Sequence, residues 1–300
     1  MLAIVMSGGG NFGALEAGAL EVLLESGVRP GLWVGTSAGG LNAIMMASNP
    51  TPHGARTLEE LWRKARPVPQ GGASIFTATR RFATGMESLF PNEPMAEFIR
   101  THLPRGCDTF GDIYDRTKER AFALAVEYPA GLVRVFGERR DDGLLDGAMA
   151  TSALPPYFPP WKVGSQRYLD GGIAANLPLR VAVEYGADEI LAMNIQGDLV
   201  MMEGSGIINI SGFALAAMIG QLTANQVEWA RQAGVRVHFL SLNAGSVRPW
   251  DFTQADFLID RGRKLAQDFL AEASRRIPHG PTQRYRVRRL IGRQPKPKDW

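Results

Sequence analysis

The chain has 300 residues, of which 45% are hydrophobic and 21% charged, and its formal net charge is +3. This composition is that of an ordinary globular protein and excludes a largely disordered or collagen-like chain. The single cysteine, Cys107, excludes an internal disulfide and is compatible with a reducing compartment.

The first fifty residues alternate between segments of strand character and segments of helix character. Strands are expected at 2–6 and 31–35, and helices at 14–27 and 38–49. The alternation returns after residue 120. Further strands are expected at 121–128, 132–138, 188–195 and 235–240, and further helices at 178–187 and 254–276. Because such alternation is typical of βαβ units, the fold class is predicted to be α/β, a mainly parallel sheet with helices on both faces.

Two later segments differ from this pattern. The most apolar stretch, 206–222, contains Asn209 and Ser211 and is shorter than the ~20 residues of a membrane span, so a core helix is expected within 207–232. Residues 67–95 combine turn formers with aromatic side chains and show no clear period, which is typical of a lid.

The first glycine-rich turn, SGGGNFGALEAG at 7–18, lies between an expected strand and an expected helix. Backbone N–H groups of glycines can face outward there, and the helix N-terminus favours negative charge, so the turn suits a phosphate or an oxyanion. Gly8, Gly10 and Gly13 can be fitted to the dinucleotide fingerprint G-x-G-x-x-G. That interpretation requires an acid at the end of the second strand, and this strand ends in GTS instead.

The second glycine-rich turn, GTSAG at 35–39, matches the pattern G-x-S-x-G and also lies between a strand and a helix. This is the context of a nucleophile elbow, in which a serine occupies strained backbone and the glycines make room for it. Both turns follow neighbouring strands. A nucleophile at Ser37 would therefore have an oxyanion site beside it.

A nucleophilic serine needs a base, and the residues alone leave two candidates. His238 completes the order Ser, Asp, His of the α/β-hydrolases, but it lies inside an expected strand, which favours a structural role. Asp170, in YLDGG, closes a strand before two glycines, where it is either the base or an acid that caps its own turn. The remaining histidines belong to no motif; they are His53, His102 and His279.

Three motifs in this order give the chain a family resemblance. SGGGNFG, then GTSAGG, then ATSALPPYFPP leading into YLDGG resemble the patatin-like phospholipases, and the resemblance runs from about residue 1 to residue 272. It implies a three-layer patatin-like fold, an acyl hydrolase domain at 1–275, and a Ser-Asp catalytic dyad without histidine, metal or cofactor. The site residues implied are Ser37 as nucleophile, Asp170 as base, Gly8, Gly9 and Gly10 as oxyanion hole, and Phe12 and Gly171 as substrate contacts.

The implied activity is hydrolysis of carboxylic esters of lipids, such as phospholipids, lysophospholipids or acylglycerols, through an acyl-serine intermediate. The alternatives are an acyltransferase with a thioester donor, and a catalytically silent module that binds lipid or a partner. Apolar residues that could line an acyl pocket are Phe76, Phe82, Met86, Leu89, Phe90 and the segment 207–219. Phe12 stands where the family carries Arg or Lys, which predicts a preference for neutral or weakly charged esters over anionic diacyl phospholipids.

The two ends of the chain bear on its location. The apolar run at the N-terminus stops at Gly8 and follows no basic region, so no signal peptide and a cytoplasmic location are expected. Residues 276–300 form a basic tail, in which seven Lys and Arg from Arg284 onward face one acid, Asp299. This tail could contact an anionic membrane peripherally, and no nucleic-acid partner is expected.

Overall fold

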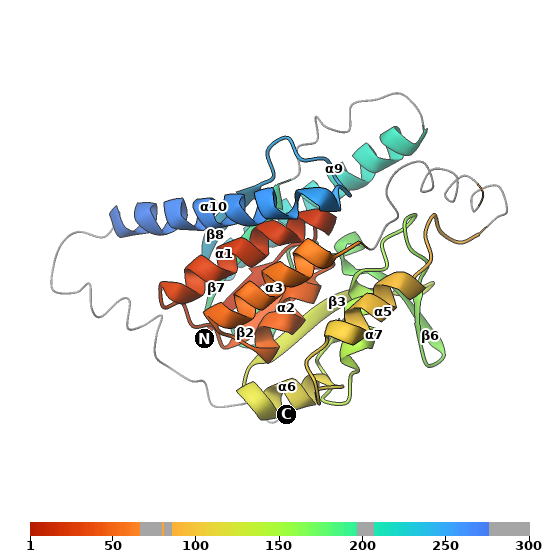
Figure 1. Ribbon diagram of the computed structural model, residues 1–300, viewed down its shortest axis with the longest axis horizontal. Coiled ribbons are helices and arrows are strands. Elements are labelled where there is room, and N and C mark those ends of the chain that lie inside the picture. Colours follow the sequence, from red (N-terminus) through yellow and green to blue (C-terminus); the bar gives the residue numbers. More distant parts are fainter. Residues whose placement is uncertain (67–79, 81–85, 197–206, 276–300) are drawn as a thin grey trace.

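A computed structural model describes residues 1–66, 80, 86–196 and 207–275. The helices surround one eight-stranded sheet (Figure 1). Its strands are β1 Leu2–Met6, β2 Leu32–Thr36, β3 Arg120–Tyr128, β4 Val133–Phe136, β5 Trp161–Val163, β6 Gln166–Asp170, β7 Glu189–Gln196 and β8 Arg236–Asn243. The α-helices are α1 Gly13–Glu25, α2 Ala38–Ser48, α3 Pro52–Lys64, α5 Glu93–His102, α6 Phe110–Thr117, α7 Leu144–Thr151, α8 Leu179–Glu184, α9 Ile207–Gln232 and α10 Ala255–Arg275.

The sheet is mainly parallel, as predicted. Its strand order is β5-β6-β3-β2-β1-β7-β8, and β4 pairs with β3 outside this path. The five strands from β3 to β8 along this order pair in parallel, whereas β4, β5 and β6 pair in antiparallel fashion. Since the carboxyl ends of parallel strands share one edge of a sheet, the turns after β1 and β2 lie side by side there.

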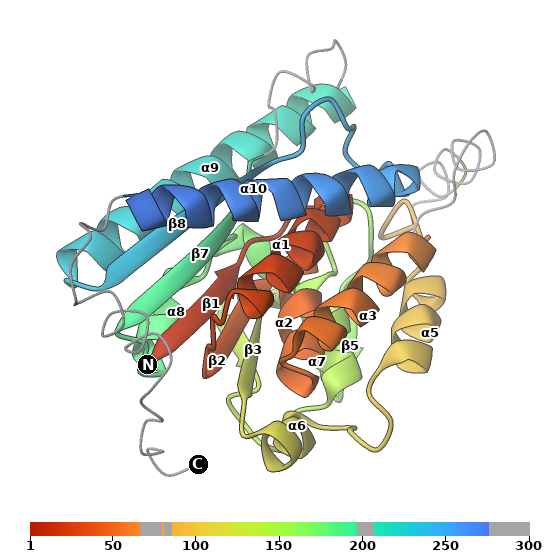
Figure 2. The ribbon, with the colours of Figure 1, turned by 60° about the vertical axis from the view of Figure 1, so that its left-hand side comes forward.

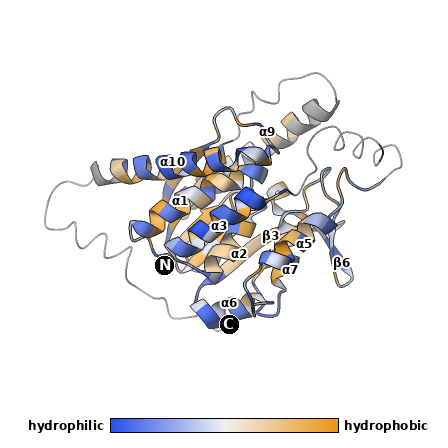
Figure 3. Cartoon of the chain, viewed as in Figure 1, coloured by the Kyte–Doolittle hydropathy of each residue, from blue (hydrophilic) through white to orange (hydrophobic). Residues whose placement is uncertain are grey.

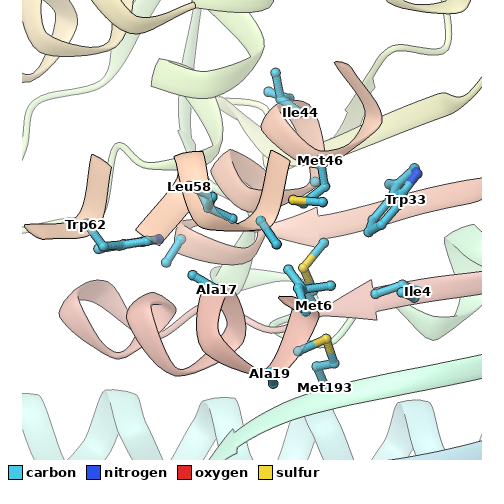
Figure 4. Close-up of a cluster of buried hydrophobic side chains, with 14 of the residues drawn as sticks. Ile4, Met6, Ala17, Ala19, Trp33, Ile44, Met46, Leu58, Trp62 and Met193 are labelled. Atoms are coloured by element: carbon cyan, nitrogen blue, oxygen red, sulfur yellow. The ribbon is translucent and has the colours of Figure 1, made fainter. Parts of the chain in front are cut away.

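Helices cover both faces of the sheet, which gives three layers (Figure 2). Side chains alternate along β1: Ile4 and Met6 pack on one face with α1, α2, α3 and α10, and Ala3 and Val5 pack on the other with α8. Figure 4 shows Met6 and Met193 projecting from their strands into the first of these clusters. Blue, hydrophilic residues mark the outer surfaces of α3 and α10 in Figure 3.

Most of the expected elements are present, but the helices α5, α6 and α7 were not predicted, and neither was α3. It begins in a recognisable way, because the Thr51 hydroxyl accepts a hydrogen bond from the Gly54 amide at 3.1 Å and Pro52 occupies the first turn. Only three residues, 49–51, separate α3 from α2, so the two helices run antiparallel. The missed helix forms one wall of the functional site.

The long helix predicted within 207–232 is present as α9, but its predicted place in the core is wrong. Ile210, Phe213 and Met218 are exposed on its N-terminal half. In the described part of the chain, every helix is too short or too polar to cross a membrane. Most of the candidate lid (67–95) and the whole basic tail (276–300) lie outside the described residues.

Candidate active site

Ser37 occupies the turn between β2 and α2 in an unusual backbone conformation. Its φ of 55° and ψ of −126° lie where a residue with a side chain is strained. The Ser37 amide donates a hydrogen bond to the hydroxyl of Thr151, at the end of α7, over 2.9 Å. This contact holds the turn, and the side chain of Ser37 opens into a cavity.

The two glycines of the pattern are required by close backbone contacts. A Cβ atom on Gly35 would lie 2.1 Å from the carbonyl oxygen of Gly39, and one on Gly39 would lie 2.5 Å from that of Met6. Neither contact involves a flexible side chain that could move away. The turn therefore has the packing of a nucleophile elbow.

Strand register brings Asp170 to the same edge as Ser37. Thr36 of β2 is paired with Leu124 of β3, and Asp170 of β6 is paired with the next residue, Ala125, on the other side of β3. Strands lie about 4.8 Å apart, so Ser37 and Asp170 flank a single intervening strand and their side chains can meet above it.

The Asp170 carboxyl is almost completely buried, with 1% of its surface exposed. Its Oδ1 accepts a hydrogen bond from the Gly172 amide at 2.7 Å, while Oδ2 is buried without a hydrogen-bond partner among the described residues. Burial raises the pKa of Asp170 to about 7, although the Gly172 amide and the Ser37 side chain each act to lower it. The carboxyl thus has one oxygen open to a proton and a pKa suited to a base at neutral pH.

The glycine turn after β1 offers backbone donors, but Gly8 is not one of the free ones. Its amide donates to the Asn176 carbonyl at 3.1 Å, and the Asn176 side-chain amide donates back to the Gly8 carbonyl at 3.2 Å. Within the described ranges, the amides of Gly9 and Gly10 donate no hydrogen bond, and Gly10 lines the cavity with Ser37. The Gly8 amide therefore already has an acceptor in this structure, whereas the amides of Gly9 and Gly10 remain candidates for an oxyanion hole.

Three further residues support the site, and the sequence analysis gave them no role. Thr151 anchors the Ser37 amide and Asn176 clamps the glycine turn. Ala38 is the first residue of α2, where backbone N–H groups have no partner within the helix, and it lines the cavity. Thr151 lies in the motif ATSALPP, where its hydroxyl among small residues was the feature of the sequence that could have indicated this role.

A cavity of about 260 Å³ extends from Ser37 between α2, α3, α5 and α7. Its lining is mostly apolar and includes Leu41, Met45, Leu58, Leu61, Met95, Phe98, Ile99, Leu103 and Phe158. Apolar cavities with a few convergent polar groups are typical ligand sites. This cavity can take a hydrocarbon chain whose polar end lies at Ser37.

The cavity has a defined direction. Since α2 and α3 run antiparallel, Ser37 and the C-terminal end of α3 lie at the same end of the cavity. The start of α5 also lies there, because Met95 and Trp250 belong to one apolar cluster and the Trp250 ring lies 3.9 Å from the position of a Cβ atom on Gly10. The opposite end contains Met45 of α2, eight residues or about 12 Å from Ser37.

Phe12 and Gly171 do not contact the cavity, which corrects both predicted substrate contacts. Phe12 is 6% exposed and packs in the core. A Cβ atom on Gly171 would lie 2.4 Å from the Leu124 carbonyl oxygen, so Gly171 serves close packing against β3.

The apolar residues expected around the acyl chain are also elsewhere. Met86 is exposed, and the described side chains of 207–219 are absent from the cavity lining. Leu89 and Phe90 pack in the cluster that contains the lining residues Met95 and Phe158, but they do not line the cavity themselves. Phe76 and Phe82 lie outside the described residues.

The described histidines differ in their distance from the site. His238 Nε2 lies 2.8 Å from Glu189 Oε1, and Glu189 begins β7, at the edge of the sheet opposite to Ser37. His102 ends α5 and lines the cavity, with Nδ1 2.8 Å from the Phe98 carbonyl oxygen. His53 lies on the exposed first turn of α3. Within the described ranges, no group of three or more His, Cys, Asp or Glu could hold a metal ion.

Comparison with known proteins finds relatives of this chain. A 219-residue stretch is 25% identical to an uncharacterised NTE family protein of Mycobacterium tuberculosis, covering 69% of this chain and 32% of that one. A 161-residue stretch is 32% identical to a cGAMP-activated phospholipase of Vibrio cholerae, covering 49% of this chain and 43% of that one. The chain thus spans about a third to two fifths of the length of these relatives.

Among solved structures, the chain is similar to VipD from Legionella pneumophila, with 11% sequence identity and a TM-score of 0.48 over 90% of this chain and 66% of that one. The family model described as patatin-like phospholipase matches residues 4–183, which include Ser37, Asp170 and both glycine-rich turns. The chain belongs to the patatin-like phospholipase family.

Proposed function

We propose that this protein is a serine acyl hydrolase that cleaves carboxylic esters of lipids through an acyl-serine intermediate. The observation that carries the proposal is the pairing of Ser37, held in a strained turn, with the buried Asp170 carboxyl at the mouth of an apolar cavity. Family membership and the phospholipase named among the relatives support the same activity.

The chemistry follows from the groups at this edge of the sheet. Asp170 Oδ2 takes the proton of the Ser37 hydroxyl as Oγ attacks the ester carbonyl carbon. The backbone amides of Gly9, Gly10 and Ala38 stabilise the oxyanion of the tetrahedral intermediate. The ester C–O bond then breaks, Asp170 returns the proton to the leaving alcohol, and Ser37 carries the acyl group.

Deacylation repeats these steps with water as nucleophile. Asp170 takes a proton from water, hydroxide adds to the acyl-serine carbonyl, and Ser37 Oγ leaves and recovers its proton. One carboxyl therefore serves both half-reactions. Its raised pKa, about 7, makes it a far better base at neutral pH than an ordinary aspartate.

The test of the proposal is Ser37→Ala. The variant is expected to lose at least 10³-fold in kcat/KM toward a short-chain aryl ester, and labelling by a fluorophosphonate probe should disappear with it. Circular dichroism and the thermal midpoint check that the fold is intact. Full activity in a folded Ser37→Ala protein contradicts the assignment of the nucleophile.

Product analysis separates hydrolysis from the alternatives. With a labelled acyl ester and an alcohol acceptor, the proposal expects label in free fatty acid. Label in a new ester indicates an acyltransferase. A wild-type protein that is neither labelled by the probe nor active on any ester indicates a catalytically silent lipid-binding module.

A further inference from the structure

Two cations lie at the end of the cavity where the ester bond would be cleaved. Lys64 is the last residue of α3 and Arg66 follows it by two residues, and both are exposed and line the cavity. The C-terminal end of α3 lies at the Ser37 end of the cavity, because Trp62 donates a hydrogen bond to Asn42 Oδ1 at 2.9 Å and the Trp62 ring lies against Gly13, as Ala38 does. These cations are therefore on the side of the leaving alcohol, away from the acyl chain.

Neither cation is neutralised by a carboxylate in the described part of the chain. Arg63, the residue before Lys64, is bound to Glu59, Glu60 and Asp256. No such ion pair is found for Lys64 or Arg66 among the described residues, and Arg66 donates only to the backbone carbonyls of Arg63 and Ala65.

The charge of the cavity lining has one sign. Its described residues include three basic side chains, Lys64, Arg66 and His102, and no aspartate or glutamate. His102 ends α5, away from the start of that helix near Ser37, whereas the two permanent cations both lie at the Ser37 end of the cavity. A bound ester with its acyl chain along α2 would place its head group beside them.

We propose that Lys64 and Arg66 form a subsite for a net negative, phosphate-bearing head group, so that the preferred substrates are acyl esters of anionic phospholipids or lysophospholipids. The inference rests on the proposed function, because it takes Ser37 as the point of cleavage. A guanidinium and an ammonium group bind phosphate oxygens through charge-assisted hydrogen bonds. This assignment reverses the neutral preference inferred from Phe12, whose ring lies in the core and cannot contact a head group.

The experiment compares three monomeric substrates that share a decanoyl chain and a glycerol backbone: a phosphate monoester, a phosphocholine ester and plain monoacylglycerol. The quantity measured is the ratio of kcat/KM for each phosphate-bearing ester to that for monoacylglycerol. The test variant is Lys64→Met/Arg66→Met. The matched control, Arg100→Met/Lys264→Met, also removes one arginine and one lysine charge, but from exposed ion pairs outside the cavity lining.

In the wild-type protein, kcat/KM for the anionic phosphate monoester is expected to be at least about ten times that for monoacylglycerol. This ratio should fall as the salt concentration is raised. The test variant should lower this ratio by about tenfold or more, and the control variant should leave it unchanged. Cations at a helix C-terminus also interact favourably with the helix dipole, so the thermal midpoints of both variants are measured. A loss of helix stability alone would not change the ratio of kcat/KM between two substrates.

An unchanged ratio in Lys64→Met/Arg66→Met overturns the subsite, as does an equal advantage for the phosphocholine ester, which carries no net charge. A wild-type protein that prefers monoacylglycerol overturns it as well. Failure of the proposed function looks different, because then the wild-type protein hydrolyses none of the three esters, or Ser37→Ala hydrolyses them equally well.

Discussion

Asp170 combines two properties that the proposed mechanism requires of its base. Its burial raises the pKa to about 7, and its Oδ1 is fixed by the Gly172 amide while Oδ2 stays open. A base of this kind acts only when ionised, and protonation removes it. The pH dependence of the reaction therefore reports on this carboxyl directly.

We expect kcat/KM for a neutral ester to rise tenfold per pH unit below about pH 7 and to level off above it. Asp170→Asn should lose at least about 10³-fold in kcat/KM, because the amide cannot accept the Ser37 proton. The measurement is a pH profile from 5 to 9 with a substrate that does not ionise. A flat profile across this range is inconsistent with Asp170 as the base.

The histidines provide a separate control on the dyad. His102→Phe tests the described histidine that lines the cavity, and His238→Gln tests the one bound to Glu189. Because neither takes part in proton transfer in the proposed mechanism, each variant should keep the pH limb near 7 and stay within about tenfold of wild-type kcat/KM. Loss of 10³-fold or more in either variant would establish a triad in place of the dyad.

At the scale of elements, the cavity is made by the pairing of α2 with α3 and by α5 and α7 beside them. Because α2 begins directly after Ser37, the proposed mechanism places the scissile carbonyl at the start of α2 and the acyl chain along this helix. Met45 marks the far end, about 12 Å away. This length suits a medium-length acyl chain.

Met45→Trp should shorten the acyl chain that the cavity accepts, because the indole ring is larger than the methionine side chain. We expect kcat/KM for a dodecanoyl ester to fall at least about tenfold, with less than about twofold change for a butanoyl ester. Met86→Trp, at an exposed methionine outside the cavity lining, is the matched control. If the chain-length profiles of the two variants coincide, the acyl chain does not follow α2.

At the scale of the whole molecule, burial lets some carboxyls keep their protons to a higher pH than usual. Burial raises the pKa of Glu119 to about 7, although the Trp33 indole donates a hydrogen bond to it at 3.2 Å. Burial raises the pKa of Glu16 as well. In the unfolded chain these groups release their protons near pH 4, so the folded state binds more protons between pH 4 and 7.

Stability should therefore fall as the pH rises from about 4 to 7 and change little above that from these groups. Glu119→Gln keeps the hydrogen bond from Trp33 and cannot ionise, so it should raise the thermal midpoint by several degrees at pH 8 and hardly at pH 4. Calorimetry at the two pH values makes the comparison. Equal effects at both pH values would show that Glu119 ionises normally in the folded protein.

The basic tail at 276–300 leads to a prediction for the full chain. A protein truncated before Arg284 lacks seven Lys and Arg and one acid. Since each cation near an anionic bilayer contributes about 1 kcal/mol, the full chain should bind anionic vesicles more tightly, with the difference lost at high salt. Vesicle sedimentation measures the binding, and equal binding by both proteins would make the tail a plain terminus.

The sequence by itself determined the α/β class, the mainly parallel sheet and the residues Ser37 and Asp170 as candidates. Local patterns carry this information: hydrophobic alternation marks the elements, and glycines two residues on either side of Ser37 are needed wherever that turn forms. A resemblance across ordered motifs then favoured Asp170 over His238. Strand register, which is not a local property, later placed Asp170 one strand away from Ser37.

Only the tertiary structure decided what surrounds these two residues. Gly8 looks like a free donor in the sequence, but its amide meets a carbonyl 168 residues away, at Asn176. Phe12 lies beside the glycine turn along the chain and yet packs in the core, whereas Lys64 and Arg66 reach the mouth of the cavity from α3. Contacts between distant segments depend on how helices pack on the sheet, and no local pattern records that packing.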